Sequence, residues 1–453
     1  MTEAERLDGY RGIWYADLES EDEYRYVYYS GGLGTYTAKH RPMAIHAEEV
    51  NRTYFTYGGV SGDGEHLYRM VSWYDHTTGM VPRPVGFPAG DTGDAHDNPA
   101  ISLDDDGHIW VFASAHGEIR PATIYRSNEP WSIDGFELIS ETNFSYPQPW
   151  HLPGKGFLFL HTRYIGGRNL YWSTSPDGRE WSEPEQLAAM DEGHYQISWA
   201  NGSKVGTAFN YHPSSEAGGN WENPEEAGAD PSASGTNNRT NLYYLETDDV
   251  GESWRTVDGM EAETPLTGSD SPALVHNYLR EGLLVYLKDM AFDHDGRPIL
   301  LYLTSRGSES GPQNDPRTWQ TAYWNGSSWE LNALTTSDNN YDSGSIYVEE
   351  DGSWTVIAPT GQGPQAWNAG GEIQKWVSRD HGASWEVTAD LTQNSEYNHS
   401  YVKKPLNHHP GFVGFWADGH GRMPSASRLY FTDWEGSVYQ LPETMTSEEE
   451  MPD

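Results

Sequence analysis

The chain has 453 residues, a formal net charge of −40 and no cysteine. Disulfides and thiolate chemistry are therefore excluded, and the lack of a basic patch argues against a nucleic-acid partner. Acidic residues are spread through the predicted loops, and most of the 28 basic residues are Arg rather than Lys. A large net charge of this kind is typical of proteins adapted to concentrated salt, so the composition predicts a halophilic, soluble protein that is monomeric.

The first ten residues are polar and acidic, and they lack the apolar core of a secretion signal. No run approaches the roughly 18 consecutive apolar residues of a membrane span. The sequence as it stands therefore predicts a cytoplasmic protein with no membrane partner. A secreted protein from which a leader had been removed would look the same.

Short strands are expected throughout the chain. Aromatic residues make up 13% of the sequence, and 48 Gly and 27 Pro residues interrupt it every few positions. This composition is typical of strands separated by tight turns, and no helix of ordinary length is expected.

One pattern, an aromatic strand followed by a polar turn and a second aromatic residue, recurs along the whole chain. In chain order it reads LYRMVSWYDHTTGMV from Leu67, IYRSNEPWSIDGFE from Ile124, LYWSTSPDGREWSEP from Leu170, LYYLETDDVGESWRTV from Leu242, AYWNGSSWELNA from Ala322, KWVSRDHGASWEVTA from Lys375 and LYFTDWEGSVYQLP from Leu429. The copies are spaced at or above the ~40–50 residues of a four-stranded propeller blade.

Each copy follows a turn and an apolar strand, such as DDDGHIWVFASAHG from Asp104 and DHDGRPILLYLTSRG from Asp293. A shorter strand, which begins directly after a polar loop, precedes each of these apolar strands. The repeating unit is thus an inner strand, a second strand, a third strand and an outer strand. The sequence predicts an all-β, seven-bladed β-propeller of four-stranded antiparallel blades over residues 1–440, followed by an acidic C-terminal tail at 441–453.

Two copies contain the complete Asp-box, S/T-x-D-x-G-x-x-W, at residues 247–254 and 378–385. The box is a hairpin turn in which Asp249 or Asp380 accepts hydrogen bonds from backbone amides and the glycine adopts a positive φ. These residues are therefore predicted to stabilise the blades and to take no part in catalysis.

Side chains suited to chemistry concentrate at one end of the predicted blades. Because neighbouring strands alternate in direction, the start of each inner strand and the loop between the second and third strands lie on the same face. These positions hold aromatic, imidazole and cationic groups: His40, His96, Tyr146, Tyr195, Lys288 and Tyr341 at the strand starts, and His116, Arg163, Tyr164, Tyr211 and His212 in the loops. A concave pocket around the axis is expected there.

These groups favour β-elimination over hydrolysis. No carboxylate pair stands out for glycoside hydrolysis, and no nucleophilic Ser motif or phosphate-binding loop is present. Arg or a protonated His can neutralise a carboxylate and so make the neighbouring C–H group more acidic. Tyr or His can then remove that proton while another group protonates the leaving oxygen. This chemistry cleaves chains of uronic acids.

Several motifs resemble those of the BNR-repeat (Asp-box) seven-bladed propeller polysaccharide lyases, a family that includes ulvan lyases and L-rhamnose-α-1,4-D-glucuronate lyases. They are GYRGIWY, YSGGLGTYTAKHRP, TYFTYGG, SYPQPW, FLFLHTRY, FNYHP, RTNLYY, YLKDMAFDHDGRP, NHSYVKKP and FWADG. The resemblance extends from Gly9 to about Phe431. It implies a lyase that cleaves a rhamnose–glucuronate linkage in a uronic-acid-containing oligo- or polysaccharide.

The resemblance also implies individual roles. In those lyases two His about twenty residues apart in the second blade are followed by a Tyr and an Arg in the third, a pattern that His96, His116, Tyr146 and Arg163 fit. Arg163 would then neutralise the uronate carboxylate with assistance from His116, while Tyr146 and His96 share the base and acid roles. Six further residues are expected to contact the substrate, namely His40, Tyr164, Tyr211, His212, Arg239 and Lys288.

No cofactor is expected to be required. Asn339 occupies a position where the family pattern has His, which argues against a metal or ligand contact there. A zinc site of the type seen in some relatives would use Cys, which this chain lacks. A structural calcium ion is compatible with the sequence, although no EF-hand-like spacing is present.

Four functions are open at this point. The leading hypothesis is an exo-acting lyase on rhamnose–glucuronate oligosaccharides, and the others are an endo-acting ulvan lyase, an α-L-rhamnosidase on the same scaffold, and a non-catalytic glycan-binding propeller. A pocket closed at one end would favour exo action, and an open groove would favour endo action.

Overall fold

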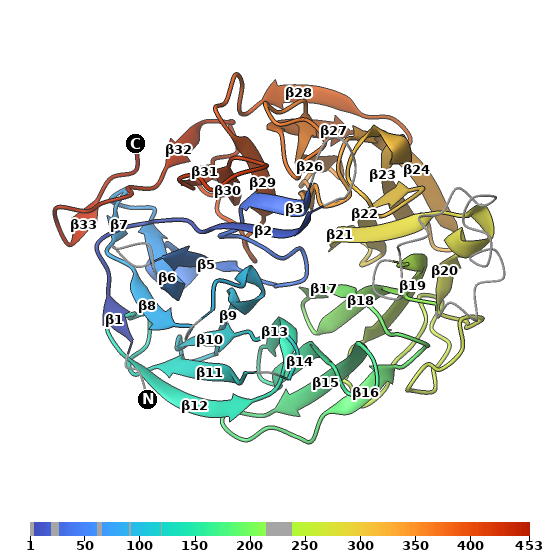
Figure 1. Ribbon diagram of the computed structural model, residues 1–453. Coiled ribbons are helices and arrows are strands. Elements are labelled where there is room, and N and C mark those ends of the chain that lie inside the picture. The colour runs from blue at the N-terminus through green and yellow to red at the C-terminus, as the bar shows by residue number, and fades with distance from the viewer. Residues whose placement is uncertain (1–3, 20–26, 61–65, 90–91, 119, 214–237) are drawn as a thin grey trace.

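The computed structural model describes residues 4–19, 27–60, 66–89, 92–118, 120–213 and 238–453. Seven antiparallel sheets surround a central axis (Figure 1). In each the four blade strands run in chain order from the axis to the rim, and the first sheet has β1 as an additional outermost strand. The predicted seven-bladed propeller is confirmed. No helix among the described residues is long and apolar enough to cross a membrane.

The first three blades follow the expected strand order. Blade 1 contains β4 (Ala44–Ala47), β5 (Arg52–Val60), β6 (Leu67–Asp75) and β8 (Val85–Pro88); blade 2 contains β9 (Pro99–Leu103), β10 (Ile109–Ala113), β11 (Ala122–Ser127) and β12 (Phe136–Thr142); blade 3 contains β13 (Ser145–Leu152), β14 (Gly156–Arg163), β15 (Asn169–Ser175) and β16 (Glu185–Ala188). The aromatic repeats identified in the sequence form the third strand of each blade.

The remaining blades repeat this order. Blade 4 contains β17 (Gln196–Asn201), β18 (Lys204–Tyr211), β19 (Thr240–Thr247) and β20 (Leu274–His276); blade 5 contains β21 (Leu284–Phe292), β22 (Pro298–Ser305), β23 (Arg317–Trp324) and β24 (Trp329–Ser337); blade 6 contains β25 (Ser345–Val348), β26 (Trp354–Gly361), β27 (Glu372–Ser378) and β28 (Glu386–Asp390); blade 7 contains β29 (Asn398–Lys403), β30 (Gly414–Gly419), β31 (Leu429–Thr432) and β32 (Val438–Gln440).

Short 3-10 turns are the only helices in the described part of the chain: η1 (Glu48–Val50), η2 (Ala95–Asp97), η4 (Tyr278–Glu281) and η5 (Pro312–Asn314). A separate hairpin of β2 (Trp14–Glu19) and β3 (Val27–Gly32) lies beside blade 7 and reaches the centre of the ring (Figure 1). This hairpin brings an N-terminal aromatic side chain, Tyr29, to the axis.

Segments from both ends of the chain complete blade 1. Strand β1 (Glu5–Arg6) pairs with β8 as a fifth strand, and β33 (Glu449–Glu450) pairs with β7 (Val81–Pro82). Leu441 and Met445 are buried in the same apolar cluster as Tyr10. The segment 441–453, expected as an acidic tail, therefore packs against the first blade.

The two complete Asp-boxes form the predicted turns. Thr247 Oγ1 donates a hydrogen bond to Asp249 at 2.7 Å, and the amide of Ser253 donates to the same carboxylate at 2.9 Å. Gly251 has a φ of 86°, and a Cβ there would lie 2.7 Å from the indole of Trp172 in blade 3. The boxes stabilise contacts between blades at the rim, as expected.

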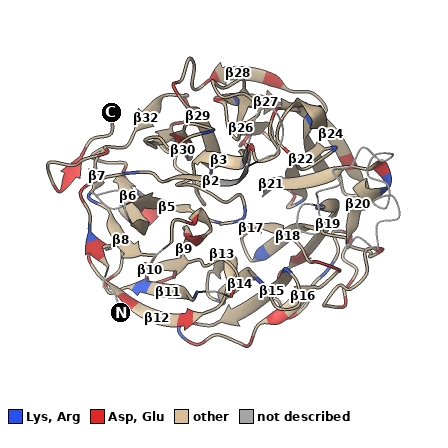
Figure 2. Ribbon diagram, in the orientation of Figure 1, with Lys and Arg blue, Asp and Glu red and all other residues tan. Residues whose placement is uncertain are grey.

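Acidic residues are distributed around the whole ring. Figure 2 shows Asp and Glu on outer strands such as β12, β28 and β33, with few Lys or Arg among them. Exposed ion pairs at the rim, such as Arg179 with Glu137, neutralise only a small part of this charge. The repulsion between the remaining carboxylates therefore acts along the entire perimeter.

Three histidines pack together where blades 1 and 7 meet. The ring of His76 lies 3.8 Å from that of His409 and 5.2 Å from that of His46. Its Nε2 is 2.8 Å from Thr53 Oγ1. Burial, together with the charge that His409 and His46 would carry, lowers the pKa of His76 to about 3, against a small opposing effect of Asp75.

This cluster predicts an acid-sensitive contact between the two blades. In the unfolded chain His76 titrates near pH 6.5, so unfolding takes up a proton between about pH 6.5 and 3 and stability falls as pH falls through that interval. We expect His76→Asn to reduce the loss of melting temperature between pH 7 and pH 5 relative to the unmodified protein. Equal losses in the two proteins would show that His76 does not contribute.

Candidate active site

A cavity of about 120 Å³ lies on one face of the ring, among side chains of the innermost strands and the loops that precede them. Its lining comes from blades 2 to 7 and from the N-terminal segment: Tyr29, Tyr36, Thr37, Ala38, Lys39, His96, His116, Tyr146, Arg168, Tyr195, Arg239, Tyr286, Lys288, Tyr341 and Tyr401. None of these described residues is Asp or Glu. In a chain with a net charge of −40, the cavity is a local concentration of positive charge.

Irregular pairing of the inner strands presents three of these side chains. The register of β13 shifts between Ser145 and Gln148, and β21 and β29 have similar shifts. Tyr146, Lys288 and Tyr401 lie at these irregularities, and both tyrosines have left-handed backbone conformations, with φ of 55° and 58°. Bulges re-aim side chains, and strained backbone of this kind concentrates at functional sites.

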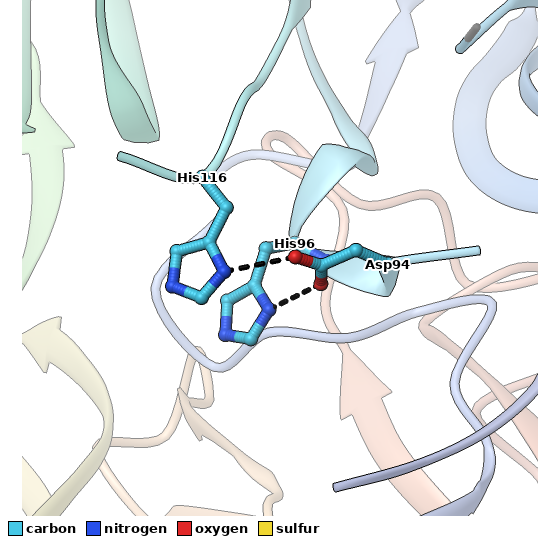
Figure 3. Close-up of side chains that lie close together, drawn as sticks. All are labelled: Asp94, His96 and His116. Carbon is cyan, nitrogen blue, oxygen red and sulfur yellow. Dashed lines mark hydrogen bonds and ion pairs between the residues drawn. The ribbon is translucent and has the colours of Figure 1, made fainter. Parts of the chain in front are cut away.

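His96 and His116 form a parallel pair held by one carboxylate (Figure 3). Their rings stack at 3.8 Å with an interplanar angle of 16°. His96 Nδ1 donates to one oxygen of Asp94 at 2.6 Å, and His116 Nδ1 donates to the other at 2.8 Å. Asp94 also caps η2 by accepting from the amide of His96. Because each ring directs Nδ1 at the carboxylate, both Nε2 atoms point away from it.

Ion pairs behind Asp94 fix its position. Arg120 lies 3.1 Å from Asp94 and also binds Asp97, which in turn accepts from Arg69 at 3.1 Å. Burial alone would raise the pKa of Asp94, but the hydrogen bonds from His116 and His96 hold that pKa well below its usual range. Asp94 is therefore an anion at neutral pH.

Asp94, His96 and His116 are also close enough together to be considered as metal ligands. Both carboxylate oxygens, however, already accept hydrogen bonds directly from the two Nδ1 atoms. The group also offers one carboxylate only, whereas calcium prefers six to eight oxygen ligands. The arrangement fits a hydrogen-bonded His–Asp–His unit better than a metal centre.

Tyr146 faces the His pair from blade 3. Its ring is 5.9 Å from that of His96 in an edge-on arrangement, and its hydroxyl accepts a hydrogen bond from Tyr164 at 3.3 Å. Arg168 donates to Tyr164 at 3.2 Å and to His212 Nδ1 at 3.3 Å. Burial raises the pKa of Tyr146 well above its usual value, so the hydroxyl is protonated in the empty cavity.

Tyr195 is surrounded by cations. Lys39 Nζ and the guanidinium carbons of Arg168 and Arg239 lie 4.9, 4.3 and 4.6 Å from the centre of its ring. Arg239 also donates to Tyr341 at 3.1 Å. Burial and the neighbouring cations lower the pKa of Lys39 well below its usual value. The two guanidinium groups lie over the ring face without being neutralised, so their charges remain available to an anionic ligand.

Lys288 Nζ donates to the carbonyl of Asn340 at 2.6 Å. Burial lowers the pKa of Lys288 to about 7, against the opposing effect of Asp342. An anion bound in the cavity would favour the charged form of this amine.

Buried side chains close the axial channel beneath the cavity. Arg41 forms an ion pair with Asp289 and donates to the carbonyl of Lys288. Lys403 Nζ donates to the carbonyls of Thr37 and His40. These charged side chains are almost completely inaccessible to solvent. Buried charged groups therefore lie behind the part of the lining formed by Thr37 and Lys288.

Half of the ten residues predicted to be catalytic or to contact the substrate line the cavity, namely His96, His116, Tyr146, Arg239 and Lys288. Tyr195 and Tyr341, which the repeat also places on this face, line it as well. Tyr164 and His212 lie directly behind it and hold Tyr146 and Arg168 in place. His40 is fully buried below, with its ring 5.9 Å from that of Tyr146. The repeat thus brings together residues that are distant in sequence.

Two predicted residues lie elsewhere. Arg163 ends β14 with its guanidinium 5.9 Å from the ring centre of Tyr171, and it is not part of the lining. Tyr211 packs edge-on against Tyr243 in the core between blades 3 and 4. Arg168, five residues after Arg163, supplies the blade 3 cation instead.

Sequence reasoning missed Asp94, Arg168 and Tyr36. Signals for two of them were present, because Asp94 stands two residues before His96 and Tyr36 lies within the motif YSGGLGTYTAKHRP. Arg168 could not be distinguished from Arg163, since one ends β14 and the other lies five residues later in the loop before β15, and only the conformation of that loop decides which one lines the cavity.

The fold and the cavity define a seven-bladed propeller with a cationic pocket of phenols and imidazoles, a site suited to an anionic ligand. The BNR repeat-containing family model matches residues 35–337, and the chain belongs to that family.

Relatives and solved structures that resemble this chain include several polysaccharide lyases. An ulvan lyase of Nonlabens ulvanivorans is 23% identical over 410 residues, with 81% of each protein covered. An ulvan lyase of Alteromonas sp. (strain LOR) is 21% identical over 324 residues, 64% of this chain and 63% of that protein. A PL25 ulvan lyase structure superimposes with a TM-score of 0.73 at 17% identity, covering 90% of this chain and 95% of the other. The predicted resemblance to propeller polysaccharide lyases is confirmed.

A second structure of a PL25 ulvan lyase is bound to -[GlcA(1-4)Rha3S]-. It has the same TM-score of 0.73 at 15% identity and covers 96% of each chain.

Proposed function

We propose that this polysaccharide lyase cleaves a rhamnose–glucuronate linkage by β-elimination. The observation that carries the proposal is a cavity lined by phenols, imidazoles, two arginines and two lysines, with no carboxylate among its described lining residues. Elimination needs positive charge for the uronate and proton carriers on either side of the sugar. The ulvan lyases among the relatives, and the bound -[GlcA(1-4)Rha3S]- of one solved structure, support the choice of sugars.

The same lining argues against the rhamnosidase alternative. Glycoside hydrolases typically place two carboxyl groups on either side of the scissile bond, one as acid and one as base or nucleophile. Asp94, the carboxylate nearest to the proton carriers, is engaged by two imidazoles and by Arg120.

We assign the residues as follows. Arg168 and Arg239 bind the uronate carboxylate and lower the energy of the carbanion-like transition state. The role expected for Arg163 falls to Arg168 in this proposal, because Arg168 lines the cavity. The proton on C5 passes to a base, the C4=C5 double bond forms, and the C4–O4 bond breaks as O4 takes up a proton. The His pair and Tyr146 carry these protons.

The shape of the cavity favours exo action. Its volume of about 120 Å³ is below the ~300–1,000 Å³ of pockets that enclose drug-sized ligands, and buried charged side chains lie behind its lining. A pocket of this kind accepts a terminal sugar unit more readily than the middle of a polymer.

The test is the appearance of an unsaturated product. Elimination conjugates the new double bond with the carboxylate, so ultraviolet absorbance is expected to grow when the enzyme meets a rhamnose-linked glucuronate oligosaccharide. A carboxyl-reduced substrate is the matched control and should give no signal. Release of rhamnose and saturated glucuronate would support the rhamnosidase instead, and binding without turnover would support a glycan-binding propeller.

Product length separates the two modes of action. An exo-acting lyase releases one small product from the start and lowers viscosity slowly. Early products of many lengths would instead indicate an endo-acting ulvan lyase.

A further inference from the structure

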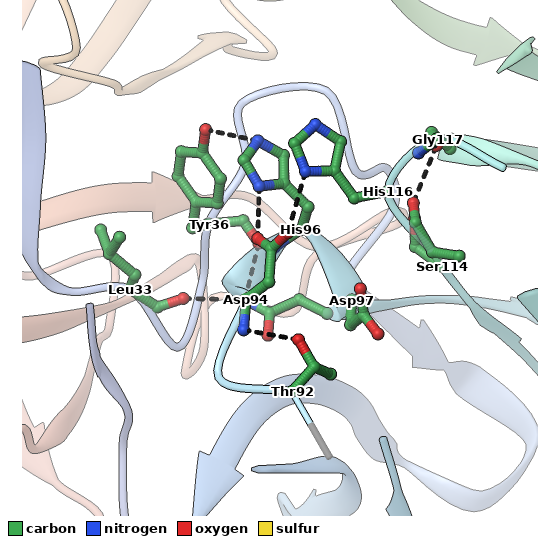
Figure 4. A network of polar contacts seen from close by, with 12 residues as sticks. Leu33, Tyr36, Thr92, Asp94, His96, Asp97, Ser114, His116 and Gly117 are labelled. Carbon is green, nitrogen blue, oxygen red and sulfur yellow. Dashed lines mark hydrogen bonds and ion pairs between the residues drawn. The ribbon is translucent and has the colours of Figure 1, made fainter. Parts of the chain in front are cut away.

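Tyr36 is joined to the His pair by a chain of hydrogen bonds (Figure 4). Because His96 Nδ1 donates to Asp94 at 2.6 Å, His96 Nε2 carries a lone pair in the neutral ring. The hydroxyl of Tyr36 donates to that Nε2 at 3.0 Å. Phenol, imidazole and carboxylate thus form one continuous unit, analogous to a nucleophile, its base and the group that orients the base.

The surroundings of Tyr36 direct this unit at the cavity. Tyr36 is 5% exposed and is part of the lining. Its ring stacks on Tyr29 at 5.0 Å and meets Tyr401 edge-on at the same distance. Aromatic contacts on two sides leave the phenol little rotational freedom, so its oxygen stays at one point beside His96.

The two imidazoles therefore differ in whether another side chain is bonded to Nε2. Both donate Nδ1–H to Asp94, but His96 Nε2 is occupied by the phenol, whereas no side chain of the described residues is bonded to His116 Nε2. Tyr36 and His96 both line the cavity, and the phenol occupies the ring nitrogen of His96 that points away from Asp94. His96 is placed to act through Tyr36.

We propose that Tyr36 is a catalytic residue, the base that removes the C5 proton, and that His96 and Asp94 activate it. This rests on the proposed β-elimination. The O–H proton of Tyr36 moves to His96 Nε2, and the phenolate oxygen takes the proton from C5. The electron pair of the C5–H bond forms the C4=C5 double bond, and the C4–O4 bond breaks with its electrons leaving on O4.

Proton balance is completed by Tyr146, which gives its hydroxyl proton to O4. The step ends with Tyr36 protonated by the substrate's hydrogen, His96 as an imidazolium paired with Asp94, and Tyr146 as a phenolate near Arg168. Transfer of the extra proton from His96 to Tyr146 through solvent restores the starting state. No oxidant, metal or second substrate is consumed.

Burial, together with the neighbouring phenols, raises the pKa of Tyr36 well above its usual value. The free enzyme therefore holds Tyr36 protonated, and the phenolate forms only when His96 accepts its proton. A phenolate of high basicity is a suitable partner for a weakly acidic C–H group. The anion at Asp94 stabilises the imidazolium that the transfer creates.

The test compares Tyr36→Phe with Tyr57→Phe on a substrate that the unmodified enzyme is first shown to cleave. Tyr57 is a buried tyrosine of blade 1 whose hydroxyl has no hydrogen-bond partner among the residues that the structure describes, so its variant controls for loss of a buried hydroxyl. Tyr36→Phe is expected to lower kcat about 10²–10⁴-fold. KM and melting temperature should stay close to those of the unmodified enzyme, and Tyr57→Phe should retain normal kcat.

Two further readouts separate catalysis from structure. With substrate deuterated at C5, Tyr36→Phe should show a larger isotope effect than the unmodified enzyme, because C–H cleavage becomes slower. Asp94→Asn also lowers kcat, but Asp94→Asn combined with Tyr36→Phe should lose little more than Tyr36→Phe alone, since the residues act as one unit.

Activity of Tyr36→Phe within about threefold of the unmodified enzyme would overturn the role of Tyr36, and so would multiplicative losses in the double variant. Failure of the unmodified enzyme to form any unsaturated product would instead overturn the proposed function. The two failures are therefore distinguishable.

Discussion

Arg168→Ala is expected to lower kcat about 10²–10³-fold, the usual effect of removing one preorganised group that stabilises transition-state charge. Arg168 lines the cavity beside Tyr195 and supports Tyr164, which in turn contacts Tyr146. Without it the uronate charge opposes carbanion formation. The measurement is the initial rate of absorbance increase at saturating substrate.

Arg163→Ala is the matched control because it removes the same group from the same loop region. Its guanidinium lies beside Tyr171 outside the lining, so we expect a much smaller loss of rate. If Arg163→Ala proved the more damaging change, the resemblance-based role of Arg163 would stand and our assignment of Arg168 would fall. Arg168→Lys should recover only part of the rate, since a lysine cannot reproduce the planar guanidinium fork.

The melting temperature is expected to rise steeply as KCl increases from about 0.1 M to about 1 M, because the Debye length falls from ~10 Å to ~3 Å over that range. With 68 acidic and 28 basic residues, carboxylate repulsion acts around the whole rim. Screening relieves that repulsion in the compact ring more than in the unfolded chain, in which the charges are farther apart.

A sucrose series tests whether screening is the cause. Sucrose strengthens burial through exclusion from the protein surface but leaves the charges unscreened. If sucrose raised the melting temperature as much as KCl does, exclusion of the solute from the protein surface would be sufficient to explain the effect of KCl. A flat or falling profile in KCl would contradict the prediction that the protein is adapted to concentrated salt.

The fold could be predicted because it is a repeat. Each aromatic strand and turn is a weak signal alone, but copies from Leu67 to Leu429 share one order of strands, and that order determines which ends meet at the axis. The pairing of β1 and β33 with blade 1 could not be predicted, because two-residue strands carry no periodicity.

The site was only partly predictable for a related reason. His96, His116, Tyr146, Arg239 and Lys288 lie at positions that the repeat places on the axial face. The contacts that give these residues their chemistry arise from irregularities that the repeat does not encode. Examples are the shifted register around Tyr146, and the 3-10 turn that aligns Asp94 with two imidazoles.

The closure of blade 1 has a consequence for biosynthesis. Its inner strands leave the ribosome early, yet its pairing with β33 requires residues 449–450, which are translated more than 350 residues after β8. Domains commonly begin to fold from the N-terminal side during synthesis, and unpaired strand edges promote aggregation. In this ring the first blade to be translated is the last that can be completed, so its open edge must remain soluble while the other six blades are made.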